Sequence, residues 1–148
     1  MPGNSDPLFI RVGKNTSVLV TAANTSSQGG GTVGTDIFLA FTADATNGSF
    51  VRRVEWIPTA TTPTTTTATV GRVFLSSVSS GATTSANTRL LAEVVLPASG
   101  ADNAAGAVFP IAIPLDIPIA PGETILVTNH AAPAANSAWR ANVFGGDY

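Results

Sequence analysis

Three glycines, Gly29, Gly31 and Gly34, have the spacing G-x-G-x-x-G that binds dinucleotide phosphates in many enzymes. Such a site also needs a helix directly after the glycines, because the helix N-terminus receives the pyrophosphate. Here the next residues, D-I-F-L-A-F, are typical of a β-strand. A P-loop is excluded too, since no Lys-Ser or Lys-Thr follows. The glycines therefore indicate a flexible loop and not a phosphate site.

The only histidine, His130, cannot form a multi-histidine metal site. A hydrolytic triad would need an activated nucleophile, but the sequence has no G-x-S-x-G and no carboxylate close to His130. The acidic residues are isolated, so a calcium loop is not indicated. A pair of carboxylates of the glycosidase type, brought together by the fold, stays open although nothing local supports it. We expect a protein that is not an enzyme and has no cofactor, with His130 structural or facing solvent.

The composition describes a neutral, hydroxyl-rich surface. Charged residues are only 11% of the 148, against roughly 25% in an average soluble domain. The formal charge is −2 and the seven basic residues are scattered, which argues against nucleic acid as a partner. The sequence contains no cysteine, no apolar run long enough to cross a membrane and no recognisable leader, so we expect a cytosolic product.

The clearest pattern lies in residues 109–122, F-P-I-A-I-P-L-D-I-P-I-A-P-G, where Phe, Ile or Leu occupies every odd position to 119. This period of two predicts a strand with one buried face. Pro110, Pro114 and Pro118 cannot donate ladder hydrogen bonds, so the strand should lie at a sheet edge. Because eleven extended residues would span about 36 Å, we also expect a bend into two segments near Pro114.

Further strands are predicted from similar alternation, with turn-rich spacers between them and no convincing helical period. The expected inward faces are Phe50, Val54 and Trp56; Leu90, Ala92, Val94 and Leu96; and Trp139, Ala141 and Val143. Three more apolar runs, L-F-I-R-V, S-V-L-V-T-A-A and D-I-F-L-A-F-T, are also strand candidates. Together they predict an all-β fold, a sandwich of two antiparallel sheets with about eight strands.

The threonine-rich tract 59–70 lies between two predicted strands, neither of which could hold a core alone. We therefore interpret it as a surface loop in a single domain covering residues 1–148. A mucin-like linker and partial disorder are the alternatives. A carbohydrate-binding sandwich would need several exposed tryptophans or tyrosines on one flat face. Trp56 and Trp139 instead fall on apolar strand faces, which predicts core packing.

Residues 113–127, I-P-L-D-I-P-I-A-P-G-E-T-I-L-V, and the ending F-G-G-D-Y resemble the C-terminal half of a viral-type jelly roll. Residues 36–58 and the segment R-V-F-L-S-S resemble small structural proteins of tailed bacteriophages, and the size and β-content are similar to capsid decoration, or cement, proteins. The resemblance covers Asp36 to Tyr148 and rests on strand cadence, not on an invariant motif.

The resemblance implies a dimer or trimer that binds the outside of the capsid and clamps neighbouring major capsid subunits. The expected location is then the virion surface, after synthesis in the host cytoplasm. Residues 1–12 are a candidate N-terminal arm, and the interface candidates are Leu8, Phe9, Ile10 and Tyr148. An ordinary first strand is the alternative for the arm. Another phage structural role (neck, tail or fibre-associated) and a carbohydrate-binding module are the alternative functions.

Overall fold

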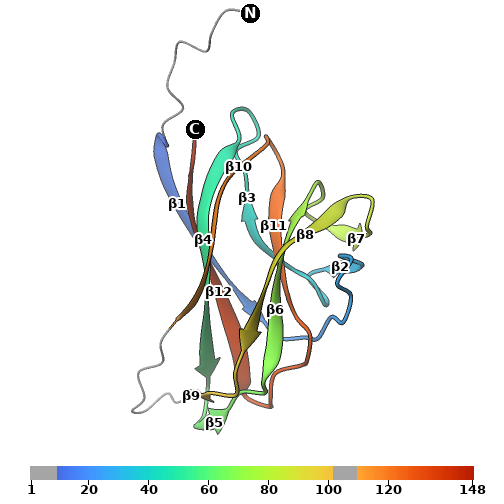
Figure 1. The fold of residues 1–148 in the computed structure, drawn as a ribbon, viewed down its shortest axis with the longest axis vertical. Coiled ribbons are helices and arrows are strands. Elements are labelled where there is room, and N and C mark those ends of the chain that lie inside the picture. The colour runs from blue at the N-terminus through green and yellow to red at the C-terminus, as the bar shows by residue number, and fades with distance from the viewer. Residues whose placement is uncertain (1–9, 102–109) are drawn as a thin grey trace, which may run out of the picture.

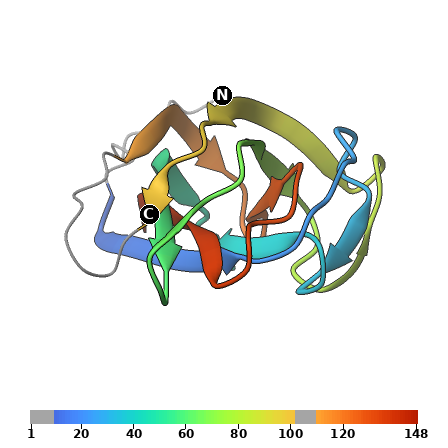
Figure 2. The same ribbon diagram turned by 90° about the horizontal axis from the view of Figure 1, so that it is seen from below.

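The computed structural model describes residues 10–101 and 110–148, which form β-strands and no helix. The strands are β1 (Val12–Val20), β2 (Gly31–Val33), β3 (Phe38–Thr42), β4 (Ser49–Ala60), β5 (Thr64–Thr65), β6 (Thr69–Ser76), β7 (Gly81–Thr83), β8 (Thr88–Leu96), β9 (Gly100–Ala101), β10 (Ile111–Ile119), β11 (Thr124–Asn129) and β12 (Ser137–Asp147). Eight of these strands build two antiparallel sheets that face each other (Figures 1 and 2).

Sheet A has the strand order β1-β12-β4-β10, and sheet B has the order β3-β11-β6-β8. When these eight strands are numbered from one to eight in chain order, the strand order of sheet A is 1-8-3-6 and that of sheet B is 2-7-4-5. This is the strand order of a jelly roll, which consists of two interlocked Greek keys. The predicted all-β, two-sheet, jelly-roll-like sandwich is therefore confirmed. The short pairs β2-β7 and β5-β9 lie outside the two main sheets.

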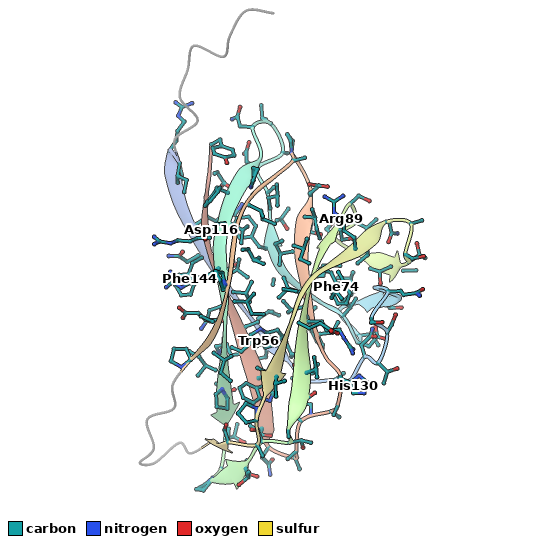
Figure 3. The ribbon with its side chains drawn as sticks, viewed as in Figure 1. Trp56, Phe74, Arg89, Asp116, His130 and Phe144 are labelled. Carbon is teal, nitrogen blue, oxygen red and sulfur yellow. The ribbon has the colours of Figure 1, made fainter. Side chains whose placement is uncertain are left out.

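One hydrophobic cluster fills the space between sheets A and B. Trp56 of β4 lies between the sheets (Figure 3), and Trp139, Ala141 and Val143 of β12 are fully buried beside it, as predicted. Burying such large rings contributes several kcal/mol, about 2–3 for each apolar side chain. A second cluster, formed by Ile37, Phe74 and Leu126 with partly buried Val33 and Leu39, lies apart from the main core. Val33 belongs to β2, so the β2-β7 pair adds a small extra layer to sheet B.

Strand β10 is the edge of sheet A, and among the strands of the described ranges only β4 pairs with it. The edge position predicted from the prolines is confirmed. Ile113 and Ile119 are buried, in agreement with the predicted buried face at the odd positions. Phe109 lies outside the described residues. The predicted division into two segments is not found, because β10 is one continuous strand, and the irregularity near Pro114 is instead a register shift between Pro114 and Ile117.

Replacing Pro114 and Pro118 together with threonine should cause self-association at high concentration. Threonine restores two backbone N–H groups on an edge strand, where they can pair with a strand of another molecule. Sedimentation velocity at increasing concentration would detect it. Thr64→Val, on the short strand β5, is a control for added β-propensity away from this edge. A double variant that sediments like the parent protein would contradict the protective role of the prolines.

Four strands contain an extra residue that shifts the register against a neighbour, and two of these bulges correct sequence-based predictions. Arg52 is the extra residue of β4 opposite β12, so Val51 and Val54 both point inward and Phe50 turns to the outer face. Leu91 is the extra residue of β8 opposite β6, and it packs on the core while Leu90 is exposed. The predictions that Phe50 and Leu90 point inward were therefore wrong, because a bulge reverses the alternation beyond it.

The threonine-rich tract is divided among ordered elements. Its first residues end β4, Thr64 and Thr65 form β5, and Thr69 begins β6. Thr66 donates from its backbone N–H to Ser99 O at 2.8 Å, which ties the tract to the segment after β8. The tract is thus a connection between a strand of sheet A and a strand of sheet B. Of the predicted strand L-F-I-R-V, Leu8 and Phe9 lie outside the described residues, and β1 begins only at Val12.

Candidate functional site

The structure brings two of the four interface candidates to the same end of sheet A. β1 begins where β12 ends (Figure 1), and the Arg11 N–H donates to Asp147 O at 2.9 Å. Ile10 is 46% exposed, and Tyr148 is half-buried with its N–H donating to Gly48 O. The other two candidates, Leu8 and Phe9, lie outside the described residues. This end of β1 is apolar, since Val12 is also 60% exposed.

A polar network fixes this end of the sandwich. Lys14 Nζ lies 3.3 Å from Asp147 Oδ2 and donates to Thr42 O of β3 at 2.7 Å, so it links the edges of the two sheets. The hydroxyl of Ser49 donates to Asp147 Oδ1 and accepts the N–H of Asp44. Asp147 thereby holds β1, β4 and β12 in one arrangement around the apolar end of β1.

Asp44 forms the turn between β3 and β4. Its Oδ1 accepts the backbone N–H groups of Asn47 at 2.7 Å and Thr46 at 2.9 Å. These hydrogen bonds, that of Asn47 first, lower the pKa of Asp44 below its ordinary value of 3.8.

We therefore expect Asp44→Ala to lower the melting temperature near neutral pH and to matter less in acid. The stabilisation by the carboxylate is fully present above the unfolded pKa of 3.8 and is lost as the pH falls through the lower folded pKa. Thermal unfolding of both proteins at about pH 7 and about pH 2.5 would measure this. A difference that grows in acid would contradict it. Asp44→Asn, which keeps an acceptor oxygen without the charge, separates the hydrogen bonds from the ionisation.

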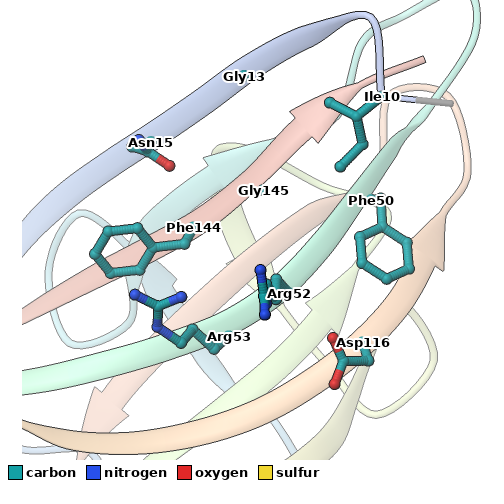
Figure 4. A pocket seen from close by; sticks show the side chains of 9 residues that line it. All are labelled: Ile10, Gly13, Asn15, Phe50, Arg52, Arg53, Asp116, Phe144 and Gly145. Atoms are coloured by element: carbon teal, nitrogen blue, oxygen red, sulfur yellow. The ribbon is translucent and has the colours of Figure 1, made fainter.

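A groove of about 640 Å³ opens on the outer face of sheet A (Figure 4). It is lined by Ile10, Gly13 and Asn15 from the β1 side, Phe144 and Gly145 of β12, Phe50, Arg52 and Arg53 of β4, and Asp116 of β10. Two aromatic rings, two arginines and one carboxylate thus share one concave surface. The groove continues to the apolar end of β1 through Ile10.

The charged groups of the groove differ in how far they are already paired. Arg53 Nε lies 2.5 Å from Glu55 Oε1, and its guanidinium carbon lies 4.1 Å from the centre of the Phe144 ring. By contrast, the side chains of Arg52 and Asp116 form no ion pair or hydrogen bond within residues 10–101 and 110–148. Arg52 and Asp116 are therefore the groups with free hydrogen-bonding capacity.

Sequence reasoning did not nominate Phe50, Phe144, Arg52 or Asp116, because their shared position depends on two bulges. The Gly145-Gly146 pair was the available signal, since glycine inside a strand often marks a bulge or a close backbone approach. Both apply to this pair, because Gly145 lies opposite the bulge of β4 and both glycines approach a neighbouring backbone closely. A Cβ on Gly145 would lie 2.3 Å from Phe50 O, and one on Gly146 would lie 2.6 Å from Val12 O.

His130 lies away from the groove residues Asp116 and Phe144 (Figure 3). It is exposed, and its Nδ1 lies 3.2 Å from Nη2 of Arg72. Arg72 is itself buried, donating from Nη1 to Asn24 O and from Nε to Glu93 Oε1. This arrangement joins the loop after β1 to β6 and β8, which agrees with a structural or solvent-facing histidine.

The three glycines with nucleotide-binding spacing lie in and around β2. Of the sequel D-I-F-L-A-F, residues 38–41 lie in the strand β3, so a strand and not a helix follows the glycines, as predicted. Gly29 and Gly34 have positive φ, so they serve turns. Within the described ranges, no three His, Cys, Asp or Glu side chains lie close enough to hold a metal ion. That same part of the chain has no helix that could span a membrane.

Comparisons with known proteins identify no relative of this chain, so the proposed function is argued from the fold and the groove. No family model matches this chain, and no curated protein and no solved structure is significantly similar to it.

Proposed function

We propose that this chain is a non-enzymatic structural protein of a tailed-bacteriophage virion. It would bind the outside of the capsid and stabilise the contacts between major capsid subunits. Its location would then be the capsid surface, and its partners the major capsid protein and further copies of itself in a dimer or trimer.

The observation that carries the proposal is the exposed apolar border formed by β1 and the residues that lead into it. Ile10, Val12 and Leu19 are three of the five exposed large hydrophobic residues in the described ranges. β1 is an edge strand with one paired neighbour, β12, and unlike β10 it contains no proline. An edge strand without proline that exposes apolar side chains is suited to packing against another protein chain.

Two further features support a role in packing. The jelly roll is common among viral capsid proteins, an argument by analogy of fold, since the same fold also occurs in lectins. The low content of charged residues reduces the desolvation cost when two large surfaces come together. Repeated binding across many subunit boundaries would then stabilise the shell by mass action.

The test is co-sedimentation with expanded capsid shells of a phage that encodes this protein. Wild type should pellet in a fixed ratio to the major capsid protein. The double variant Ile10→Ser and Val12→Ser should bind at least tenfold more weakly, because two apolar contacts of about 1 kcal/mol each are lost. Val95→Ser is the matched control, since Val95 is 72% exposed but lies on β8 of the other sheet. Wild type that stays in the supernatant would overturn the proposal.

The oligomeric state gives a second measurement. A compact dimer or trimer in sedimentation velocity would support a decoration protein, whereas a monomer at all concentrations would favour a carbohydrate-binding module. A neck, tail or fibre-associated role is the closest alternative and predicts binding to those parts of the virion instead of to shells. For a carbohydrate-binding module, the tryptophans cannot serve as the platform, because both are fully buried.

A further inference from the structure

Two β-bulges meet in the groove on the outer face of sheet A. Arg52 is the extra residue of β4, and the register of β10 shifts directly opposite it, between Pro114 and Ile117. Asp116, inside this shift, has a φ of 48°, a left-handed conformation that costs most residues about 1–2 kcal/mol, although aspartate adopts it more readily than most. Bulges are common beside binding sites because they re-aim side chains. Strain without a partner inside the fold suggests that Asp116 serves a ligand.

The free groups of the groove are complementary in hydrogen bonding. The Arg52 guanidinium is only a donor, and the ionised Asp116 carboxylate is only an acceptor. Both project into the groove from neighbouring strands (Figure 4). A ligand with several hydroxyl groups can satisfy both, because each hydroxyl donates and accepts. Asn15, on the other side of the groove, adds a side-chain amide that can both donate and accept hydrogen bonds.

The aromatic residues supply the apolar part of the same surface. Phe144 and Phe50 belong to adjacent strands, and the cross-strand partner of Phe50 is Gly146, two residues beyond Phe144. With about 3.4 Å per residue along a strand and about 4.8 Å between strands, their Cα atoms lie about 8 Å apart. Aromatic side chains on Cα atoms at this separation can contact the C–H faces of sugar units of one short chain, with Phe144 using the ring face that Arg53 does not cover, while the polar groups bind its hydroxyls.

We infer that this groove binds a neutral oligosaccharide. A neutral ligand is favoured because Arg52 and Asp116 have opposite charges and Arg53 is already paired with Glu55 at 2.5 Å. A volume of about 640 Å³ is in the usual range of ligand sites. This activity goes beyond the proposed capsid role and does not rest on it. The groove lies on the outer face of sheet A and adjoins the border of β1 at Ile10, so its test uses variants of other residues.

The groove can be blocked without disturbing the sandwich. A Cβ on Gly13 would meet no atom of the described residues within 4 Å, and Gly13 lines the groove. Gly13→Gln should therefore place a side chain in the groove at little cost to folding. Gly100 in β9 has the same free space around a Cβ but lies outside the groove, so Gly100→Gln is the matched control.

The test is affinity electrophoresis through gels that contain laminarin, dextran, mannan or polygalacturonate. Wild type should be retarded by at least one of the three neutral polysaccharides and not by polygalacturonate alone. Gly13→Gln and Phe50→Ala should reduce this affinity at least tenfold, whereas Gly100→Gln should leave it unchanged. No retardation by any neutral polysaccharide would overturn the inference, as would retardation that Gly13→Gln does not change.

Asp116→Gly separates a ligand role from a structural one. Glycine adopts a positive φ without strain, so the melting temperature should rise by about 2 °C while sugar binding is lost. A residue needed only for folding would instead lower the melting temperature when replaced. Binding that survives in Asp116→Gly would contradict the assigned role of the carboxylate. Capsid co-sedimentation is measured independently, so either result can fail alone.

Discussion

Gly145→Ala is expected to lower the free energy of unfolding by about 3 kcal/mol, although it adds a single methyl group. The new Cβ would lie 2.3 Å from the carbonyl oxygen of Phe50 and 3.3 Å from the Cα of Val51. Both atoms belong to the backbone of β4, which β10 holds on its other side. The clash therefore cannot be relieved by rotating a side chain, and the pairing between β4 and β12 must shift.

Equilibrium unfolding in urea, followed by tryptophan fluorescence, would measure this loss because Trp56 and Trp139 are in the core. Gly13→Ala is the matched control in the same sheet, since its Cβ would meet no atom within 4 Å in the part of the chain that the structure describes. We expect the control to change stability by less than about 0.5 kcal/mol. Equal stability of the two variants would show that β12 does not approach β4 as closely as described.

Arg72→Ala should cost about 3 kcal/mol, which would make it the most damaging change of a charged residue among those described. The Arg72 side chain is only 8% exposed, and it reaches Glu93 Oε1 at 2.6 Å and Asn24 O at 3.1 Å. Its removal leaves a buried carbonyl oxygen without a donor and opens a cavity beneath the loop after β1. Arg72→Lys should also destabilise the fold, because one ammonium cannot replace a planar group with several donors.

The control for this prediction is Arg53→Ala. Arg53 forms an equally short ion pair with Glu55, at 2.5 Å, but its side chain is 36% exposed. Solvent screening reduces the value of such a pair, and we expect a loss of less than about 1 kcal/mol. Thermal and urea unfolding of the two variants side by side would test the difference. If Arg53→Ala were the more harmful change, burial would not be what gives Arg72 its importance.

The sequence is sufficient for the fold class because its strongest signals are local. The alternation in residues 109–122 and the positions of Pro114 and Pro118 predict an edge strand, and β10 is one. The alternation around Trp139 predicts an inward face, and that face is buried. These features depend only on the period of a strand and on the missing N–H of proline.

The groove could not be predicted in the same way, because it depends on the pairing of distant strands. A bulge inserts one residue relative to a partner strand, and the partner of Arg52 lies more than ninety positions away, near Gly145. Alternation alone therefore assigned Phe50 to the core. The contacts of Arg72 have the same origin, since Asn24 and Glu93 come from opposite sides of it in sequence. Two of the interface candidates, Ile10 and Tyr148, lie at the same end of sheet A, and their role in an interface stays a prediction.

Strand β12 occupies the interior of sheet A, between β1 and β4. Neither β1 nor β4 can complete its hydrogen-bond ladder with β12 until residue 147 has left the ribosome. Until then, both strands have an unpaired edge where β12 will insert. Folding should therefore be late and slow, as for other proteins dominated by distant pairings. A product of early termination would keep both edges open and is expected to be cleared by chaperones and proteases or to precipitate.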